Sequence, residues 1–94
     1  MYNKLYIKYS MYNFIRDGGY SLKLGNYLRR FRFEHDEISQ QALADAVGVT
    51  RLTIHSIEKG KFVPSTLLAF KLAKFFGKNV EEVFYLIDEN SGEK

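Results

Sequence analysis

Apolar residues recur at helical spacing along the chain after residue 20. Steps of three and four residues between apolar positions are typical of helices that bury one face. We therefore predict five consecutive helices and no convincing strand pair, the first helix spanning about residues 21–35 and the fifth carrying apolar positions up to residue 87. The predicted inward-facing residues are Leu24, Leu28, Phe31, Leu43, Ala44, Val47, Ile54, Ile57, Leu68, Phe70, Leu72, Phe75, Phe76, Val80, Val83, Phe84 and Ile87.

Small polar residues and glycines mark the ends of the predicted helices. Hydroxyl and amide side chains bind the free amides of a first helical turn, and glycine accepts the positive φ at which many helices stop. The expected starts are Ser21, Ser39, Thr50, Ser65 and Asn79, the last forming a capping-box pattern with Glu82, and the expected stops are Gly48, Gly60 and Gly77. Because the connections hold only two to five residues, the helices predict one all-α domain over 21–87, followed by a polar tail at 88–94.

The first 20 residues form an aromatic extension that holds five of the seven tyrosines. Alternation of apolar and polar side chains from Leu5 to Tyr12 predicts a strand, although helical spacing also fits part of this segment. No other segment offers this strand a partner, and isolated strands are unstable in water. We therefore interpret the extension as a self-association element, with an ordered tail on the helical body as the alternative.

Composition excludes several kinds of chemistry. Among the 94 residues there is no cysteine, which excludes disulfides and thiolate zinc sites, and we expect no cofactor and no metal site around the two distant histidines. No apolar run approaches the roughly 20 residues of a membrane span, and lysines interrupt the opening segment, so we expect a cytoplasmic protein. The net charge is +3, with seven basic residues in 1–34 and five acidic ones in 79–94, which indicates a basic surface on part of the molecule.

The stretch 39–65, SQQALADAVGVTRLTIHSIEKGKFVPS, carries the main functional signal. It predicts two short helices joined by a tight turn, because Ala44 permits a close helix crossing and Gly48 can make the turn. Val49 and Ile54 then lock the angle between the two helices. This is the geometry of a helix-turn-helix, which holds its second helix outward so that it can enter the major groove of DNA.

Over about residues 21–87 the chain resembles the phage repressor and Cro family of helix-turn-helix proteins, the xenobiotic-response-element type. The matching residues are Gln40, Leu43, Ala44, Gly48, Val49, Thr50, Ile54, Ile57, Glu58, Gly60, Pro64 and Ser65, continued by Ala73, Phe76, Gly77, Glu81, Glu82 and Phe84. The resemblance implies a compact five-helix, lambda-repressor-like domain. It also implies a transcriptional regulator, and specifically a repressor, that binds double-stranded DNA in a sequence-specific way.

Three departures from the family pattern affect what we expect. The stretch 32–38 is one residue longer and lacks the usual glycine, Lys78 replaces a buried valine, and Leu52 replaces a polar residue early in the recognition helix. The resemblance further implies that Glu58 forms a structural ion pair with Arg32 and has no catalytic role. Such a pair fixes the packing of two helices.

The residues at the start of the predicted recognition helix are the candidates for reading bases. Arg51 can donate two hydrogen bonds to guanine, or alternatively contact phosphate. Leu52 can pack on a thymine methyl group or simply touch the core, and Ser56 lies one turn further along the same face. His55 lies beside the groove or is merely exposed to solvent. The full set of predicted DNA-binding residues is Gln40, Thr50, Arg51, Leu52, Thr53, His55, Ser56, Lys59 and Lys61.

The rest of that set is expected to contact the DNA backbone. In the family the glutamine at the position of Gln40 binds a phosphate, aided by the free amides of the helix start. Thr53 lies beside the backbone, and Lys59 and Lys61 flank Gly60 where the family grips phosphate. Such contacts position a protein without reading sequence, and plain solvated surface is the alternative for the two lysines.

One recognition helix reads only a few base pairs, so we expect a homodimer on a two-fold operator with half-sites about 34 Å apart. Tyr85, Leu86 and the extension are the predicted dimer contacts. An antitoxin-like protein, which would bind a toxin through residues 1–20 and repress its own operon, is the alternative. An enzyme has no support, because no nucleophile is paired with a base and no phosphate-binding glycine loop is present.

Overall fold

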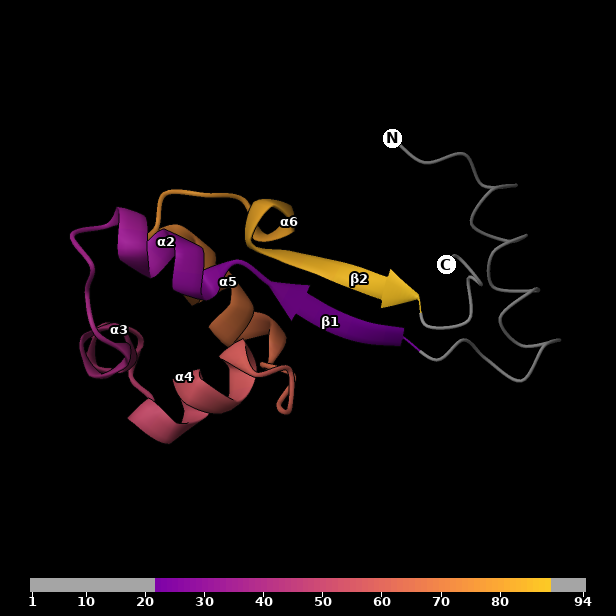
Figure 1. Ribbon diagram of the computed structural model, residues 1–94, viewed down its shortest axis with the longest axis horizontal. Coiled ribbons are helices and arrows are strands. Elements are labelled where there is room, and N and C mark those ends of the chain that lie inside the picture. The colour runs from indigo at the N-terminus through magenta and orange to yellow at the C-terminus, as the bar shows by residue number, and fades with distance from the viewer. Residues whose placement is uncertain (1–21, 89–94) are drawn as a thin grey trace, which may run out of the picture. The chain divides into compact units, whose positions relative to one another are not determined.

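The segment 22–26 contains Gly25 and Asn26, and both disfavour a helix interior. In the computed structural model, which describes residues 22–88, this segment is a strand, and a helix begins only after it (Figure 1). The described elements are β1 (Leu22–Asn26), α2 (Leu28–Glu34), α3 (Gln40–Val47), α4 (Arg51–Glu58), α5 (Thr66–Phe75), α6 (Val80–Val83) and β2 (Phe84–Asp88). The predicted strand within residues 1–20, the predicted cap at Ser21 and the tail at 89–94 lie outside the described residues.

The two strands correct the expectation of an all-α fold. β1 pairs with β2 in a two-stranded sheet, and the two run in opposite directions (Figure 1). The predicted first helix is therefore wrong at its start, and the predicted fifth helix is wrong beyond Val83. The physical reason is that each strand finds its partner about 60 residues away, and such pairing overrides the helical spacing of a short apolar run.

Gly25 of β1 lies directly against the ring of Tyr85 on β2. A Cβ added at Gly25 would lie 2.4 Å from Cε2 of Tyr85, so only glycine leaves room for the tyrosine ring as it stands. The Tyr85 ring also lies 4.8 Å from the ring of Tyr27, centroid to centroid. Tyr27 in turn donates its backbone amide to the carbonyl of Val83, 2.9 Å away, which ties the end of β1 to the end of α6.

Asn26 replaces the predicted serine as the side chain that starts the first helix. Its Oδ1 accepts the amide of Leu28 (3.1 Å), and its Nδ2 donates to the carbonyl of Ile57 at the end of α4 (2.9 Å). One side chain thus joins the entry of α2 to the far end of α4. The other predicted serine and threonine caps are confirmed, since Ser39, Thr50 and Ser65 accept the amides of Ala42, Thr53 and Leu68.

The loop after α2 shows how the chain manages without the usual glycine. Asp36 and Glu37 adopt φ angles of 60° and 54°, in the left-handed region that glycine favours. Aspartate tolerates this region better than glutamate because its short side chain can bond locally. The three glycines predicted to end helices, Gly48, Gly60 and Gly77, do have positive φ.

The core lies between the helices and is closed by the start of β2. Its buried apolar residues are Leu28, Leu43, Ala44, Val47, Ile54, Ile57, Leu68, Leu72, Ala73, Phe76, Val83 and Phe84. Leu24, Phe31, Phe75 and Val80 are half-buried and pack against this core. Two predicted core residues are wrong: Phe70 is 59% exposed and Ile87 is 42% exposed. Lys78 is exposed, as its replacement of a buried valine predicts. None of the helices described is long and apolar enough to cross a bilayer.

Candidate nucleic-acid interface

Helices α3 and α4 are joined by a turn of three residues, and the sequence explains its shape. Gly48 takes a φ of 80°, which lets its amide and that of Val49 both bond to the carbonyl of Ala44, at 2.8 and 3.0 Å. Thr50 then caps α4, its Oγ1 accepting the amide of Thr53 at 3.2 Å. Since Ala44 is fully buried, the helices pack closely, and the direction of α4 is fixed by the turn and the core together.

The faces of α4 are sharply different. Ile54 and Ile57 are buried and anchor the helix to the core. Arg51 is exposed, and Leu52 keeps 64% of its surface in solvent. Thr53, His55 and Ser56 are half-buried along the flank of the helix. The start of α4 therefore presents side chains to solvent from a helix that is anchored in the core.

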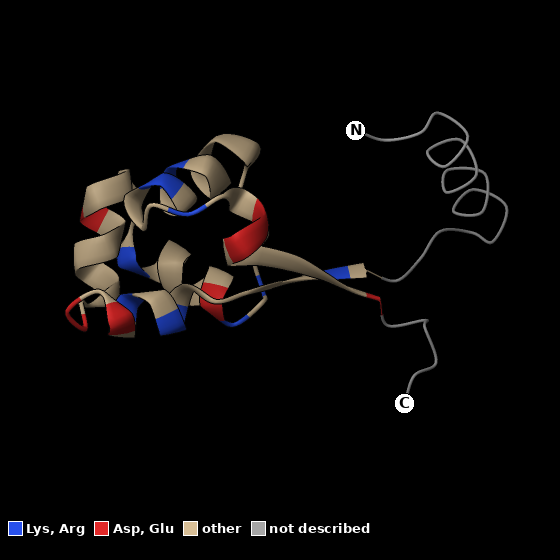
Figure 2. Cartoon of the chain, turned by 90° about the horizontal axis from the view of Figure 1, so that it is seen from above, with Lys and Arg blue, Asp and Glu red and all other residues tan. Residues whose placement is uncertain are grey.

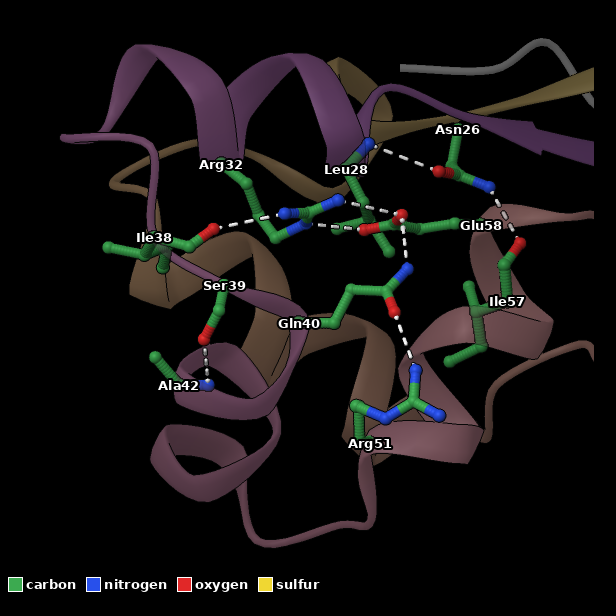
Figure 3. Close-up of polar contacts among 10 residues, drawn as sticks. All are labelled: Asn26, Leu28, Arg32, Ile38, Ser39, Gln40, Ala42, Arg51, Ile57 and Glu58. Atoms are coloured by element: carbon green, nitrogen blue, oxygen red, sulfur yellow. Dashed lines mark hydrogen bonds and ion pairs between the residues drawn. The ribbon is translucent and has the colours of Figure 1, made fainter.

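The ion pair implied by the resemblance is present between α2 and α4. Arg32 donates from Nε to Oε2 of Glu58 at 2.7 Å and from Nη2 to Oε1 at 3.0 Å, a two-bond arrangement that fixes both planes (Figure 3). Nη1 of Arg32 also donates to the carbonyl of Ile38. The two charged side chains are only 15% and 8% exposed. Glu58 is thus a structural group that holds the end of α4 against α2.

Gln40 connects this buried pair to the protein surface. Its Nε2 donates to Oε1 of Glu58 at 3.0 Å, and its Oε1 accepts from Nη1 of Arg51 at 3.1 Å (Figure 3). A carboxylate only accepts hydrogen bonds and a guanidinium only donates them, so the amide has one orientation that satisfies both neighbours. These two contacts use the Gln40 carbonyl oxygen and one of its two amide protons. The sequence analysis predicted only a phosphate contact for Gln40 and did not include its hydrogen bonds with Glu58 and Arg51.

The other predicted site residues fall into two groups. Thr50 acts as a helix cap, and its hydroxyl lies 3.0 Å from the hydroxyl of Thr53. Lys59 and Lys61 are exposed on both sides of Gly60, and the amide of Lys61 donates to the carbonyl of Ser56. Two groups of predicted residues thus lie together. Gln40 contacts Arg51 across the helix-turn-helix. Leu52, Thr53 and Ser56 of α4 lie around one shallow pocket with Lys61 of the following loop.

Sequence reasoning missed Phe62, which lies next to this group. Phe62 is 49% exposed and lines a shallow pocket together with Leu52, Thr53, Ser56 and Lys61. Sequence reasoning also missed Asn26, whose contact with Ile57 steadies the end of α4. The available signals were an aromatic residue in a polar loop beside a predicted phosphate-binding lysine, and an asparagine directly before a helix.

Charge alone does not mark the interface. Figure 2 shows basic and acidic residues interspersed over the described part of the chain, so the expected segregation of charge is not evident there. Within residues 40–62 the basic side chains are Arg51, Lys59 and Lys61, and the acidic ones are Asp45 and Glu58. Because Glu58 is paired with Arg32, the charge that this segment presents to solvent is mainly positive.

Comparison with known proteins agrees with this geometry. Residues 32–83 match the family described as Helix-turn-helix. An uncharacterized HTH-type transcriptional regulator of Methanocaldococcus jannaschii is 48% identical over 64 residues, covering 68% of this chain and 96% of that protein. The uncharacterized HTH-type transcriptional regulator YgzD of Bacillus subtilis is 54% identical over 52 residues, covering 55% and 79% of the two chains. The chain therefore belongs to the Cro/C1-type (XRE) helix-turn-helix family of DNA-binding transcriptional regulators.

Proposed function

We propose that this protein is a sequence-specific repressor that inserts α4 into the major groove of an operator. The observation that carries the proposal is the exposed start of α4, where Arg51 and Leu52 stand outward on a helix fixed by Ile54 and Ile57. A rigid helix is a better reader than a loop because its side chains meet the base edges in one arrangement. Because DNA is the proposed partner, we also propose a cytoplasmic location.

Base reading falls first to Arg51. Its guanidinium is held by Gln40 through one hydrogen bond, which leaves the other donors free for O6 and N7 of a guanine. Since Gln40 is itself bonded to Glu58, the arginine is oriented before DNA arrives. Fixing a side chain in advance lowers the entropy cost of binding. Ser56 is the next base-reading candidate along the helix, and His55 is a further contact on the same flank.

The remaining candidates contact the sugar–phosphate backbone. The spare amide proton of Gln40 and the charges of Lys59 and Lys61 supply donors at both ends of the helix-turn-helix. Thr53 is half-buried beside the Thr50 cap and presents its hydroxyl at the same level. These contacts set the register of α4 in the groove and add affinity that depends on salt.

Useful specificity requires two copies of the domain on a two-fold operator. The exposed side chains of Tyr85 (39%), Leu86 (67%) and Ile87 (42%) on β2 support a homodimer contact at this strand. Two recognition helices on one face of the duplex are separated by about 34 Å, one helical turn. A repressor of this kind acts by occupying a promoter.

Selection of bound sequences from a random duplex pool tests this function. We expect an enriched motif with two-fold symmetry, and recovery of random sequence would contradict specific binding. Arg51→Ala should then weaken binding to the selected site by about 5-fold to 150-fold per half-site, because one bidentate contact with guanine is worth about 1–3 kcal/mol. Arg29→Ala, an exposed arginine on α2, is the matched control and should leave affinity nearly unchanged. Equal losses on selected and random DNA would make Arg51 a phosphate contact.

The antitoxin-like alternative rests on residues 1–20, which lie outside the described residues. Its operator would be read by the same helix, so DNA selection does not separate it from a simple repressor. Isolation of the protein from its native host does so. Co-purification with a small protein encoded by the adjacent gene would support the alternative, and a lone homodimer would contradict it.

A further inference from the structure

A shallow pocket lies on the proposed DNA-reading side of α4. Leu52, Thr53 and Ser56 of α4 line it together with Lys61 and Phe62 of the following loop, and its volume is about 270 Å³. Leu52 and Phe62 keep 64% and 49% of their surfaces exposed, although both are large and apolar. No acidic side chain lines the pocket.

We infer that this pocket binds the C5 methyl group of a thymine in the major groove, and that Phe62 is a specificity-determining residue of the protein. The inference rests on the proposed function and specifies which base the second exposed residue of α4 reads. The notable member is Phe62, because it lies outside the recognition helix and contacts the base edge from the loop side.

The chemistry of the lining favours a thymine methyl over other occupants. In the major groove the thymine methyl is the one apolar group among the base edges, and all other groups there are hydrogen-bond donors or acceptors. Leu52 and Phe62 offer this methyl group an apolar surface, and the hydroxyls of Thr53 and Ser56 in the same lining are available to polar atoms of the adjoining base edges. Lys61 places a positive charge at the rim, which complements the phosphates that flank any base in the groove.

The position of the pocket relative to Arg51 supports the same occupant. Arg51 immediately precedes Leu52 on α4, and both side chains are exposed at the start of the helix. A guanine bound by Arg51 would therefore have its neighbouring base pair close to Leu52 and Phe62. We expect the selected half-site to contain a thymine directly next to, or one step from, the guanine that Arg51 reads.

The test replaces each thymine of the selected operator in turn by deoxyuridine, which pairs identically but lacks the methyl group. At one symmetric pair of positions we expect affinity to fall about four-fold per half-site, because burial of one such carbon group is worth about 0.8 kcal/mol. Phe62→Ala and Leu52→Ala should each weaken binding to the thymine duplex and abolish the difference between thymine and deoxyuridine. Leu67→Ala, which removes an equally exposed leucine (66%) outside the pocket, should preserve that difference.

The outcomes separate this inference from the proposed function. Specific binding with no position sensitive to deoxyuridine, or a selected motif without thymine, would overturn the inference and leave the proposed function intact. The inference alone also fails if a sensitive position exists but Phe62→Ala discriminates as strongly as the unmodified protein. Absence of specific DNA binding altogether would overturn both.

Discussion

Removal of Glu58 offers a quantitative test of how α4 is held. Glu58→Ala deletes the acceptor of three hydrogen bonds, two from Arg32 and one from Gln40. It leaves the Arg32 guanidinium, 15% exposed, bonded to the carbonyl of Ile38 but without its carboxylate. Breaking a buried ion pair by removing one member typically costs about 3–5 kcal/mol, because the remaining charge stays buried without compensation.

That cost is large for a chain of this size. A domain of 94 residues has a free energy of unfolding of about 5–14 kcal/mol. Each kcal/mol shifts the melting temperature of such a domain by about 4–8 °C, so we expect Glu58→Ala to lower it by at least about 12 °C. Urea unfolding followed by far-ultraviolet circular dichroism gives the free energy, and a thermal scan gives the melting temperature.

Two further variants test whether burial of the ion pair causes the loss of stability expected for Glu58→Ala. Arg30 and Glu34 on α2 form the same kind of pair at 3.1 Å, but their side chains are 67% and 53% exposed. Glu34→Ala should therefore cost only about 0.3–0.5 kcal/mol. The double variant Arg32→Met, Glu58→Leu removes both buried charges and should be more stable than Glu58→Ala alone. If Glu58→Ala lowers the free energy of unfolding no more than Glu34→Ala does, the buried ion pair does not hold α4 in the way described.

Three other substitutions give distinct expectations. Lys61→Ala should lower affinity similarly for all DNA sequences and reduce the slope of log affinity against log salt by about one unit per bound subunit, and an unchanged slope would show that Lys61 does not contact phosphate. Glu37→Gly should raise the free energy of unfolding by up to about 1 kcal/mol, since φ at Glu37 is 54°, and a loss of stability in urea unfolding would contradict the strain argument. Gly25→Ala should destabilise the domain by about 1 kcal/mol because its Cβ displaces the Tyr85 ring, but should do no harm in a Tyr85→Ala background. Equal costs in both backgrounds, measured by thermal unfolding, would exclude Tyr85 as the cause.

The middle of the chain was predictable because its signals are local. Helices α3, α4 and α5 each begin at a serine or threonine that caps its own helix, and the buried positions of α3 and α4 follow from spacing alone. The pair of Arg32 with Glu58 was accessible through the family resemblance, although 26 residues separate its members. Each of these features depends on neighbours in sequence or on a shared motif.

The two ends of the domain were not predictable in the same way. Leu24 fits a helical stripe with Leu28 and Phe31, and only its pairing partner β2 makes the segment a strand. Gly25 and Asn26 within the predicted helix were the local warning, since both are poor helix formers. In the site, the link from Gln40 to both Glu58 and Arg51 depends on three-dimensional placement that no spacing rule contains.

Methylation protection on the selected operator tests the central claim most directly, because dimethyl sulfate modifies guanine N7 in the major groove and adenine N3 in the minor groove. If α4 enters the major groove, the bound protein protects guanine N7 at two symmetric positions about 34 Å apart, and Arg51→Ala removes that protection. Protection confined to adenine N3, or protection of guanine N7 that persists in Arg51→Ala, would contradict the proposed reading of DNA by this helix.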